Sequence, residues 1–252
     1  MLILYHRLSL PGLPYYGNLA TSILRLCRAS KSYSAGGVVV QALREVSLEA
    51  RQGEFLALAG RSGCGKTTLL NLAGAMDFPT SGEVHLDGVL TSALSEAALA
   101  RLRREKVGFI FQSFQLLPTL SIVENVELPL LLGRKGRARQ TALECLDWVE
   151  MGAFARRMPY QLSGGQMQRA AIARALASSP KLLLADEPTG NLDDATSDLI
   201  LRLLRRIVDE KKTTLVMATH SVEAAAMADG VVRLRDGQVE QYGVSREISC
   251  IT

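Results

Sequence analysis

Long apolar runs are missing from this sequence of 252 residues. A membrane-spanning helix needs roughly 18 to 20 consecutive apolar residues, whereas the longest candidates here, such as residues 128–132, are interrupted by Pro129 or end within a few positions. The N-terminal region also lacks the continuous apolar core of a secretory signal, because His6 and Arg7 interrupt it. We therefore expect no membrane-spanning segment, and we interpret residues 1–22 as a loosely attached extension.

Cysteines are few, and there is no large excess of positive or negative charge. The four cysteines are scattered and form no C-x-x-C pair, which argues against a metal knuckle or a disulfide framework and favours a reducing cytoplasm. The net charge is only +4, and the basic clusters at residues 101–106 and 134–139 are short. We interpret both clusters as solvated faces rather than a nucleic-acid-binding stripe, with attraction to an anionic membrane surface as the alternative.

The remaining composition, 48% hydrophobic and 21% charged, is typical of a globular protein large enough for one sizeable α/β domain with an inserted subdomain. Alternating residues at 23–27 and 38–48 predict early antiparallel strands, and helical spacing between about 113 and 160 predicts the inserted helical subdomain. Strands and helices then alternate, which predicts a largely parallel sheet within a domain over 23–245, followed by a tail at 246–252. The other predicted elements are strands at 55–59, 84–86, 107–111, 182–185 and 214–218, helices at 163–177 and 195–208, and a closing hairpin turned at Asp236 and Gly237.

A glycine-rich loop joins the strand at 55–59 to the helix that follows it. The loop matches the pattern of glycine, four residues, glycine, lysine and serine or threonine. Its glycines let backbone N–H groups converge on phosphate oxygens, and the helix N-terminus adds partial positive charge. We expect Lys66 to contact the β- and γ-phosphates of a nucleoside triphosphate and Thr67 to bind Mg²⁺. The residues predicted to bind nucleotide here are Gly60, Arg61, Ser62, Gly63, Cys64, Gly65, Lys66, Thr67 and Thr68.

Two acidic residues follow the apolar strand at 182–185. Open α/β sheets place ligand chemistry at the carboxyl ends of their strands, so Asp186 and Glu187 are predicted to lie beside the phosphate loop. Asp186 suits contact with Mg²⁺. Glu187 points elsewhere, because it is one residue further on, and it can polarise the attacking water as a general base.

Residues 162–166, Leu-Ser-Gly-Gly-Gln, lie between the loop and the acids and narrow the choice of function. A phosphate loop alone says only that a nucleoside triphosphate binds. With all three motifs, the chain resembles the nucleotide-binding subunit of ATP-binding-cassette (ABC) transporters from about residue 23 to residue 242. The resemblance implies an ATPase with a P-loop NTPase fold of the α/β class: an ABC ATPase core with an early antiparallel β subdomain and an inserted α-helical subdomain.

The resemblance also implies that ATP is bound between two chains. In this family two cassettes dimerise head to tail, so that ATP on one phosphate loop is closed over by the Leu-Ser-Gly-Gly-Gln segment of the other. From the residues alone, the alternative for both Ser163 and Asp193 is a helix N-cap, and for Ser163 the two roles can hold at once. The residues expected to contact ATP across the interface, or to cross it, are Ser163, Gly164, Gly165, Gln166 and Asp193.

Single positions carry further roles by the same resemblance. Gln112 matches the family's glutamine that contacts Mg²⁺ and the attacking water and senses the membrane partner, which adds Gln112 to Thr67 and Asp186 as metal contacts. His220 matches the histidine that holds the γ-phosphate, and Tyr33 matches the aromatic residue that stacks on adenine. Catalysis is thus expected of Glu187, His220, Gln112 and Lys66. Two positions depart from the family's pattern: Ser221 stands where aspartate is frequent, and Cys64 stands where a small residue such as serine is common.

Several segments resemble the lipoprotein-releasing and macrolide-exporter branch of the family: residues 79–82, 116–118, 124–130 and 186–193. Membership of this bacterial branch implies a homodimer with ATP and Mg²⁺, attached to integral-membrane permease subunits at the cytoplasmic face of the inner membrane. A periplasmic adaptor belongs to some of these systems, and nucleic acid to none. Two alternatives remain open: a regulatory ABC protein that uses ATP as a dimerisation switch, and a soluble ABC ATPase outside transport.

Overall fold

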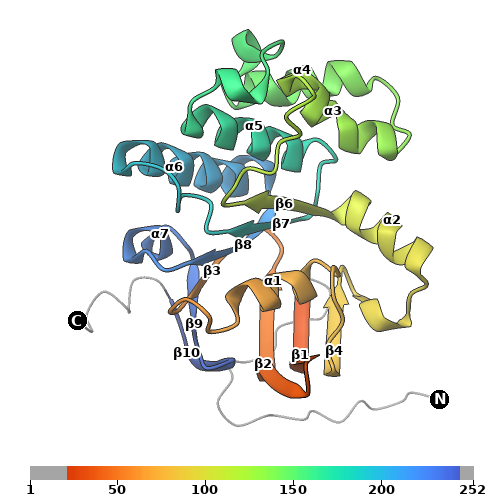
Figure 1. Cartoon of the computed structure of the whole chain (residues 1–252), viewed down its shortest axis with the longest axis vertical. Coiled ribbons are helices and arrows are strands. Elements are labelled where there is room, and N and C mark those ends of the chain that lie inside the picture. The colour runs from red at the N-terminus through yellow and green to blue at the C-terminus, as the bar shows by residue number, and fades with distance from the viewer. Residues whose placement is uncertain (1–21, 245–252) are drawn as a thin grey trace, which may run out of the picture.

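The computed structural model describes residues 22–244. The predicted extension at 1–22, apart from Ser22, and the predicted tail at 246–252 lie outside the described residues. Within them, no helix combines the length and the apolar character that crossing a membrane requires. The strands form two sheets, and Figure 1 shows the antiparallel sheet at one end of the molecule and a group of helices at the other, with the second sheet between them.

The central sheet has six strands, and its inner strands are parallel, as the sequence predicts. The three strands at 55–59, 182–186 and 214–219 are buried on both faces, which explains their continuous apolar runs. In one of these strands, Leu183 and Ala185 pack into one core and Leu182 and Leu184 into the other. The strand order is β10 (Gln238–Val244), β9 (Gly230–Arg235), β3 (Phe55–Ala59), β8 (Thr214–Thr219), β7 (Leu182–Asp186) and β6 (Val107–Phe111).

Helices cover both faces of this sheet. On one face lie α5 (Gly164–Leu176) and α6 (Asp194–Lys211), whose apolar residues join the larger core. On the other face lies α1 (Lys66–Ala73), which joins the second core together with the antiparallel sheet. The carboxyl ends of β3, β6, β7 and β8 therefore meet at one edge between the two cores, and the loops that leave this edge carry the candidate site.

The antiparallel sheet has the order β2 (Val38–Arg51), β1 (Ser22–Ala35), β4 (Ser81–Leu86) and β5 (Val89–Leu90). Its first two strands are longer than predicted, and they are joined by a tight turn at Gly36 and Gly37, both with positive φ. The sequence predicts a first strand that ends too early, because register shifts after Leu26 break the alternation of buried and exposed residues. At this bulge Arg28 has a φ of 46°, and its guanidinium pairs with Glu45 across the strands at 2.6 Å.

The inserted region contains α3 (Ile122–Leu132), α4 (Ala138–Trp148) and two 3-10 turns at Gly152–Phe154 and Pro159–Gln161. Helix α3 begins at Ser121, which forms a capping box with Glu124 and so satisfies the first backbone donors. Its buried face packs against α4 and α5, where Val126, Ala142 and Leu146 have no exposed surface. The helical spacing in this part of the sequence reflects that contact.

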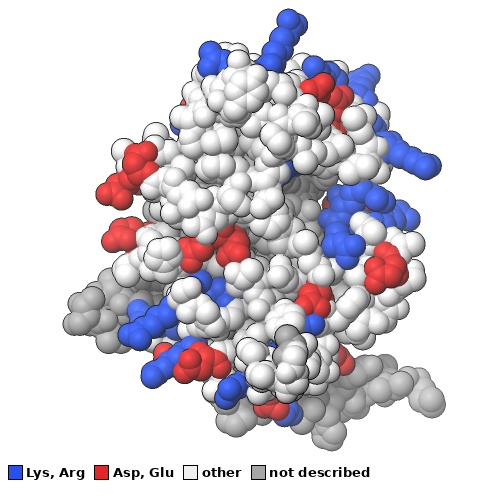
Figure 2. All heavy atoms as spheres, viewed as in Figure 1, with Lys and Arg blue, Asp and Glu red and all other residues white. Residues whose placement is uncertain are grey.

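Two helices were missed by the sequence reading. Helix α2 (Glu96–Lys106) begins at the N-cap Ser95 and has only Leu99 fully buried, so it lacks the apolar stripe that predicts a helix. It carries the basic cluster at 101–106, and Figure 2 shows this charge gathered on the surface over α2. Helix α7 (Val222–Ala226) has five residues, too few to show a periodic pattern.

Candidate functional site

The glycine-rich loop turns sharply between β3 and α1. Gly65 is the N-cap of α1 with a φ of 106°, and a Cβ there would lie 2.6 Å from the carbonyl oxygen of Ala42. Gly63 also has a positive φ of 79°, but among the described residues nothing lies within 4 Å of the point that its Cβ would occupy. The loop is thus closed on the side of β2 and open at Gly63. A hollow of about 900 Å³ lies on the outer side of residues 60–64, between them, His220, α7 and residues 231–240, and Lys66 and Asp186 do not line it. Backbone N–H groups at a helix N-terminus that faces open space form an anion site.

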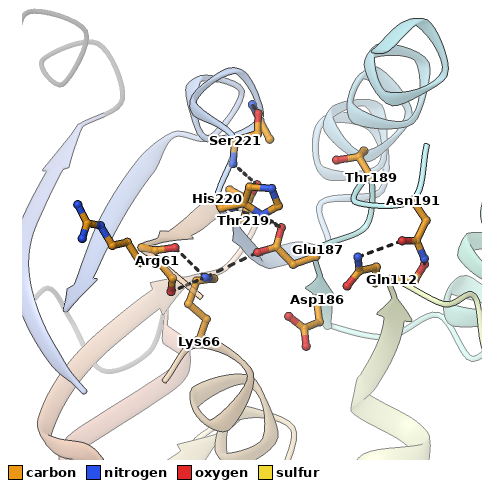
Figure 3. Close-up of polar contacts among 12 residues, drawn as sticks. Arg61, Lys66, Gln112, Asp186, Glu187, Thr189, Asn191, Thr219, His220 and Ser221 are labelled. Carbon is orange, nitrogen blue, oxygen red and sulfur yellow. Dashed lines mark hydrogen bonds and ion pairs between the residues drawn. The ribbon is translucent and has the colours of Figure 1, made fainter. Parts of the chain in front are cut away.

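Lys66 is the first residue of α1, and its side chain reaches back to the start of the loop. Its ammonium Nζ donates hydrogen bonds to the carbonyl oxygens of Gly60 at 2.7 Å and Arg61 at 3.1 Å. It also lies 3.7 Å from Oε1 of Glu187, and Figure 3 shows it pointing across the site toward that carboxylate. The Lys66 side chain is only 7% exposed. A buried ammonium with three oxygen neighbours is well placed to exchange them for phosphate oxygens, which carry more negative charge.

Thr67 and Asp186 offer oxygen ligands next to the loop. The hydroxyl of Thr67 donates to Oδ2 of Asp186 at 2.9 Å, which joins the start of α1 to the end of β7. Burial, reinforced by the negative charge of Glu187, raises the pKa of Asp186 above its ordinary value, although the Thr67 hydrogen bond and the Lys66 charge act in the opposite direction. A divalent cation beside Asp186 would reverse this effect, and hydroxyl and carboxylate oxygens are the donors that Mg²⁺ prefers.

Gln112 is the third predicted metal contact. It follows β6, whose last residue Phe111 pairs with Asp186 on β7, so the two side chains leave the same edge of the sheet. The amide Nε2 of Gln112 donates to Oδ1 of Asn191 at 3.1 Å, and the amide of Asn191 donates to the backbone oxygen of Gln112 at 3.1 Å. Because the nitrogen of the Gln112 amide is engaged, its oxygen is the atom that can face a cation. The residues present therefore fit Mg²⁺.

The side chains of Glu187 and His220 are in polar contact at the ends of β7 and β8. Nδ1 of His220 lies 2.8 Å from Oε2 of Glu187. The backbone of Glu187 has a φ of 47°, and its N–H donates to the oxygen of Ala218 on β8 at 3.0 Å, which turns its side chain away from Asp186. Figure 3 shows the two acids pointing in different directions. The Glu187 side chain is 17% exposed, whereas that of His220 is 68% exposed. The sequence suggested both residues but not their contact.

The two departures from the family's pattern have local explanations. Ser221 is the N-cap of α7, and its hydroxyl accepts a hydrogen bond from the N–H of Ala224 at 3.0 Å. Serine and aspartate are both good N-caps, so this exchange preserves the start of the helix. Cys64 is 7% exposed and packs into the second core, beside Gly60. Its thiol therefore acts as a small apolar group under the loop.

The Leu-Ser-Gly-Gly-Gln segment begins α5, on the face of the central sheet opposite α1 and the phosphate loop (Figure 1). Ser163 is an N-cap, and it forms a capping box with Gln166. The following glycines allow a close approach to α6, since a Cβ on Gly165 would lie 2.4 Å from Cγ2 of Thr196. Within one chain, the central sheet thus lies between the phosphate loop and the segment formed by Ser163, Gly164, Gly165 and Gln166.

Asp193 also has a cap function in the single chain. Its Oδ1 accepts a hydrogen bond from the N–H of Thr196 at 3.0 Å, at the start of α6. This hydrogen bond and a second one from the Thr196 hydroxyl lower the pKa of Asp193. Within one chain, Asp193 therefore caps the start of α6. The role at a dimer interface that the sequence predicts for Asp193 would involve a second chain as well.

Gln168 is a residue that sequence reasoning missed. It has no exposed surface, and its amide donates to the backbone oxygen of Pro188 at 2.7 Å. This bond joins α5, which carries the Leu-Ser-Gly-Gly-Gln segment, to the turn directly after Glu187. No sequence signal marks it, because a glutamine on a helix is usually solvated and Pro188 is distant in sequence.

Tyr33 lies on the β1–β2 hairpin and is 41% exposed. Its hydroxyl donates to Oδ2 of Asp77 at 3.0 Å, and the ammonium of Lys31 lies 5.0 Å from the centre of its ring. Lys31 and Asp77 also pair with each other at 2.5 Å. The Tyr33 hydroxyl is thus held by Asp77, which itself pairs with Lys31, while much of the ring faces solvent. An exposed ring with a fixed hydroxyl is suited to stacking on a base.

Replacing Tyr33 with alanine is expected to weaken ATP binding by roughly tenfold or more, because base–aromatic stacking is worth about 1–3 kcal/mol. Tyr33→Phe is the matched control, since it keeps the ring and loses only the hydrogen bond to Asp77. Affinity is measured by displacement of a fluorescent ATP analogue. If the phenylalanine variant binds as weakly as the alanine variant, the ring is not the group that holds adenine.

Known proteins are similar to this chain over most of its length. The family model described as ABC transporter matches residues 43–190. The chain is 44% identical over 225 residues to the uncharacterized ABC transporter ATP-binding protein MJ0796 of Methanocaldococcus jannaschii, with 87% of this chain and 96% of that protein covered. A dimeric solved structure of MJ0796 in a post-hydrolysis state, bound to ADP and Pi, superposes with a TM-score of 0.82 at 43% identity, over 88% of this chain and 99% of that one.

Two further relatives have names that state a task. The lipoprotein-releasing system ATP-binding protein LolD of Anaeromyxobacter dehalogenans is 45% identical, over 90% of this chain and 97% of that protein. The macrolide export ATP-binding/permease protein MacB of Rhodopirellula baltica is 46% identical over 87% of this chain, which spans 33% of that longer protein. The family match, these identities and the phosphate loop beside Asp186 and Glu187 together show that the chain belongs to the ABC transporter family, as one of its ATP-binding ATPases.

Proposed function

We propose that the chain is the ATP-hydrolysing subunit of a bacterial ABC transporter. In this proposal two copies dimerise on ATP, and hydrolysis drives a conformational change in a membrane permease of the export or lipoprotein-release type. The observation that carries it is the separation of the phosphate loop and the Leu-Ser-Gly-Gly-Gln segment on opposite faces of one sheet. Two anion-binding helix N-termini that cannot meet within one chain can close on one nucleotide only between two chains.

The proposed chemistry assigns one task to each side chain of the site. Lys66 binds phosphate oxygens, and Thr67, Asp186 and Gln112 hold Mg²⁺, which supplies charge neutralisation of the triphosphate when it is bound. Glu187 accepts the proton of the attacking water, and His220, whose Nδ1 lies 2.8 Å from this carboxylate, holds the γ-phosphate. The second copy contributes Ser163 and the N–H groups at the start of its α5.

Support for the dimer comes from the relative of similar length. The solved structure of MJ0796 is a dimer with ADP and Pi, and it covers 88% of this chain at 43% identity. Support for a permease partner comes from the names of LolD and MacB, of which MacB carries a permease in its own chain. We therefore place the protein at the cytoplasmic face of the inner membrane, bound to a permease, with a periplasmic adaptor in the assembly if it follows the exporters.

The surface proposed to dock on the permease lies over residues 112–132, close to Gln112. It exposes apolar side chains that a single chain leaves in water: Leu117 is 43%, Leu131 55% and Leu132 64% exposed. A docking surface next to Gln112 would connect the partner directly to the edge of the sheet that carries Asp186. Large apolar side chains exposed on one segment are the kind of surface that a protein partner covers.

Replacing Leu131 and Leu132 with glutamate is expected to abolish the stimulation of ATP turnover by the permease while basal turnover stays within about twofold, because surface substitutions away from a site usually change little. The matched control is Leu199→Glu on α6, where the leucine is 52% exposed. Turnover is measured with the chain alone and with permease-containing membranes. Equal stimulation of the double variant and the wild type would contradict this docking surface.

The proposal as a whole is tested by purifying the chain from membranes at its natural abundance and identifying what accompanies it by mass spectrometry. A stoichiometric multi-span permease with a large extracytoplasmic domain would support the export or release branch. Ribosomes or DNA-repair proteins would favour the soluble alternative, and cell-division proteins the regulatory one. Either result would overturn the transport role and leave the ATPase in place.

A further inference from the structure

The outer face of the antiparallel sheet carries three possible metal ligands from two neighbouring strands. Cys27 lies on β1 and pairs in register with Glu83 on β4, and His85 follows two residues later on the same face. The intervening side chains, Leu26 and Val84, are each 1% exposed and point into the second core. Cys27, Glu83 and His85 therefore share the face that points away from the core.

These side chains converge rather than merely share a face. One ligand atom from each, the cysteine Sγ, a glutamate oxygen and an imidazole nitrogen, all lie within 4.8 Å of one another. Nε2 of His85 is already 2.9 Å from Oε2 of Glu83. Ligands of a tetrahedral zinc ion are separated by roughly 3.3–3.8 Å, given metal–ligand lengths of about 2.0–2.3 Å. Side-chain rotations that shorten the widest spacing by about 1 Å reach that geometry.

We propose that Cys27, Glu83 and His85 bind a zinc ion, with water in the fourth position. The donor set decides the metal, since thiolate and imidazole favour Zn²⁺ over the hard cations Mg²⁺ and Ca²⁺, which prefer oxygen alone. This centre is separate from the nucleotide site, whose ligands come from the edge of the central sheet. Sequence reading excluded a C-x-x-C knuckle, but it could not exclude a site assembled across two strands.

The three ligands have a basic neighbour in Arg25, whose side chain hydrogen-bonds to the Cys27 thiol. Arg25 pairs in register with both His85 on β4 and Glu49 on β2, so a metal ion at Cys27 would require its guanidinium to turn from the thiol toward Glu49. Thiolate and carboxylate ligands then neutralise the metal ion itself. Burial raises the pKa of the Cys27 thiol, partly offset by Arg25. Zinc binding at neutral pH consequently releases the thiol proton of Cys27, so zinc affinity falls as the pH is lowered.

A metal held here would clamp β1 to β4. Pairing of these strands is interrupted by a register shift between Cys27 and Ser30, directly after the proposed ligand. The same strand continues to Tyr33, which is proposed to stack on adenine. The site would thus fix the strand on the near side of the bulge and leave the nucleotide-facing hairpin to pair with β2 alone.

The test is a zinc titration of the full chain in competition with a chromophoric zinc indicator, without nucleotide. We expect one equivalent of zinc to bind to the wild type, and zinc affinity to fall at least about tenfold in Cys27→Ser and in His85→Gln. Loss of a residue that only hydrogen-bonds to a metal ligand already lowers metal affinity by about tenfold, so loss of a ligand should lower it at least as much. Two matched controls should bind zinc like the wild type: Cys145→Ser, which alters another half-buried thiol, and His220→Gln, which alters the nucleotide site.

A second readout does not depend on the variants' folding. Zinc should slow alkylation of Cys27 in the wild-type chain, read by peptide mass spectrometry, while the rate at Cys145 stays unchanged. Zinc affinity that is lost in His220→Gln and kept in His85→Gln would overturn the proposal, because it would place the metal at Glu187 and His220. Substoichiometric binding, or equal alkylation of Cys27 with and without zinc, would overturn it as well.

Discussion

Replacing Glu187 with glutamine is expected to lower ATP turnover by on the order of 100-fold or more, because the amide keeps the shape of the side chain but cannot accept a proton. ATP binding should persist, since Lys66 and the loop are unchanged. Dimers with bound ATP should therefore accumulate. Turnover is measured by phosphate release, and dimers by size-exclusion chromatography with ATP and Mg²⁺.

The geometry explains why glutamine is the informative substitution. Glu187 is oriented by its backbone, which has a φ of 47° and donates to Ala218, so the amide variant should point the same way. Its two oxygens face different partners: Oε1 lies 3.7 Å from Lys66 and Oε2 2.8 Å from His220. An amide can present only one oxygen, and it keeps one of these contacts. The variant thus removes the base with little disturbance of the loop.

Glu150→Gln is the matched control, because Glu150 is an exposed acid that pairs with Arg169 at 2.8 Å and lies outside the site. Its turnover should equal that of the wild type. Unchanged hydrolysis in Glu187→Gln would remove Glu187 from its proposed role and point to another base. A loss of ATP binding in Glu187→Gln would instead show that the variant disturbs Lys66.

The parts of the site that the sequence predicts are those in which neighbours in sequence are also neighbours in space. The phosphate loop is such a case, because a buried strand, a glycine turn and a helix follow one another directly at residues 55–73. Asp186 and Glu187 are another, because a strand buried on both faces must deliver the next residues to the edge of the sheet. Strand β3 even has the predicted bounds.

Features that depend on contacts between distant segments could not be predicted in this way. The hydrogen bond from Gln168 to Pro188 depends on how α5 packs on the central sheet. The grouping of Cys27 with His85 depends on the register of β1 and β4, which a bulge shifts. A change of one residue in register would place these side chains on opposite faces. Sequence periodicity shows which residues of a strand share a face, but it does not show how two strands are aligned with each other.

Replacing Lys66 with alanine is expected to act one step earlier than the change at Glu187. Charge-assisted hydrogen bonds contribute about 1.5–3 kcal/mol each, so ATP affinity should fall by roughly tenfold to a hundredfold or more. Turnover should become undetectable, and no ATP-dependent dimer should form. Affinity is measured by isothermal titration calorimetry, and dimers by the same chromatography as for Glu187→Gln.

Two effects of the Lys66→Ala change must be separated. The ammonium also donates to the oxygens of Gly60 and Arg61 within the loop, so its removal could disturb the loop rather than delete a ligand of phosphate. Lys66→Arg keeps the charge and these donors but replaces a compact ammonium with a planar fork. If the loop needs only the donors, the arginine variant should bind ATP like the wild type; if phosphate needs the compact group, both variants should fail. Retention of binding and turnover in Lys66→Ala would contradict the phosphate-loop assignment. Because Glu187→Gln should trap the dimer that Lys66→Ala cannot form, the double variant should remain monomeric, which orders nucleotide binding before dimer closure and closure before hydrolysis.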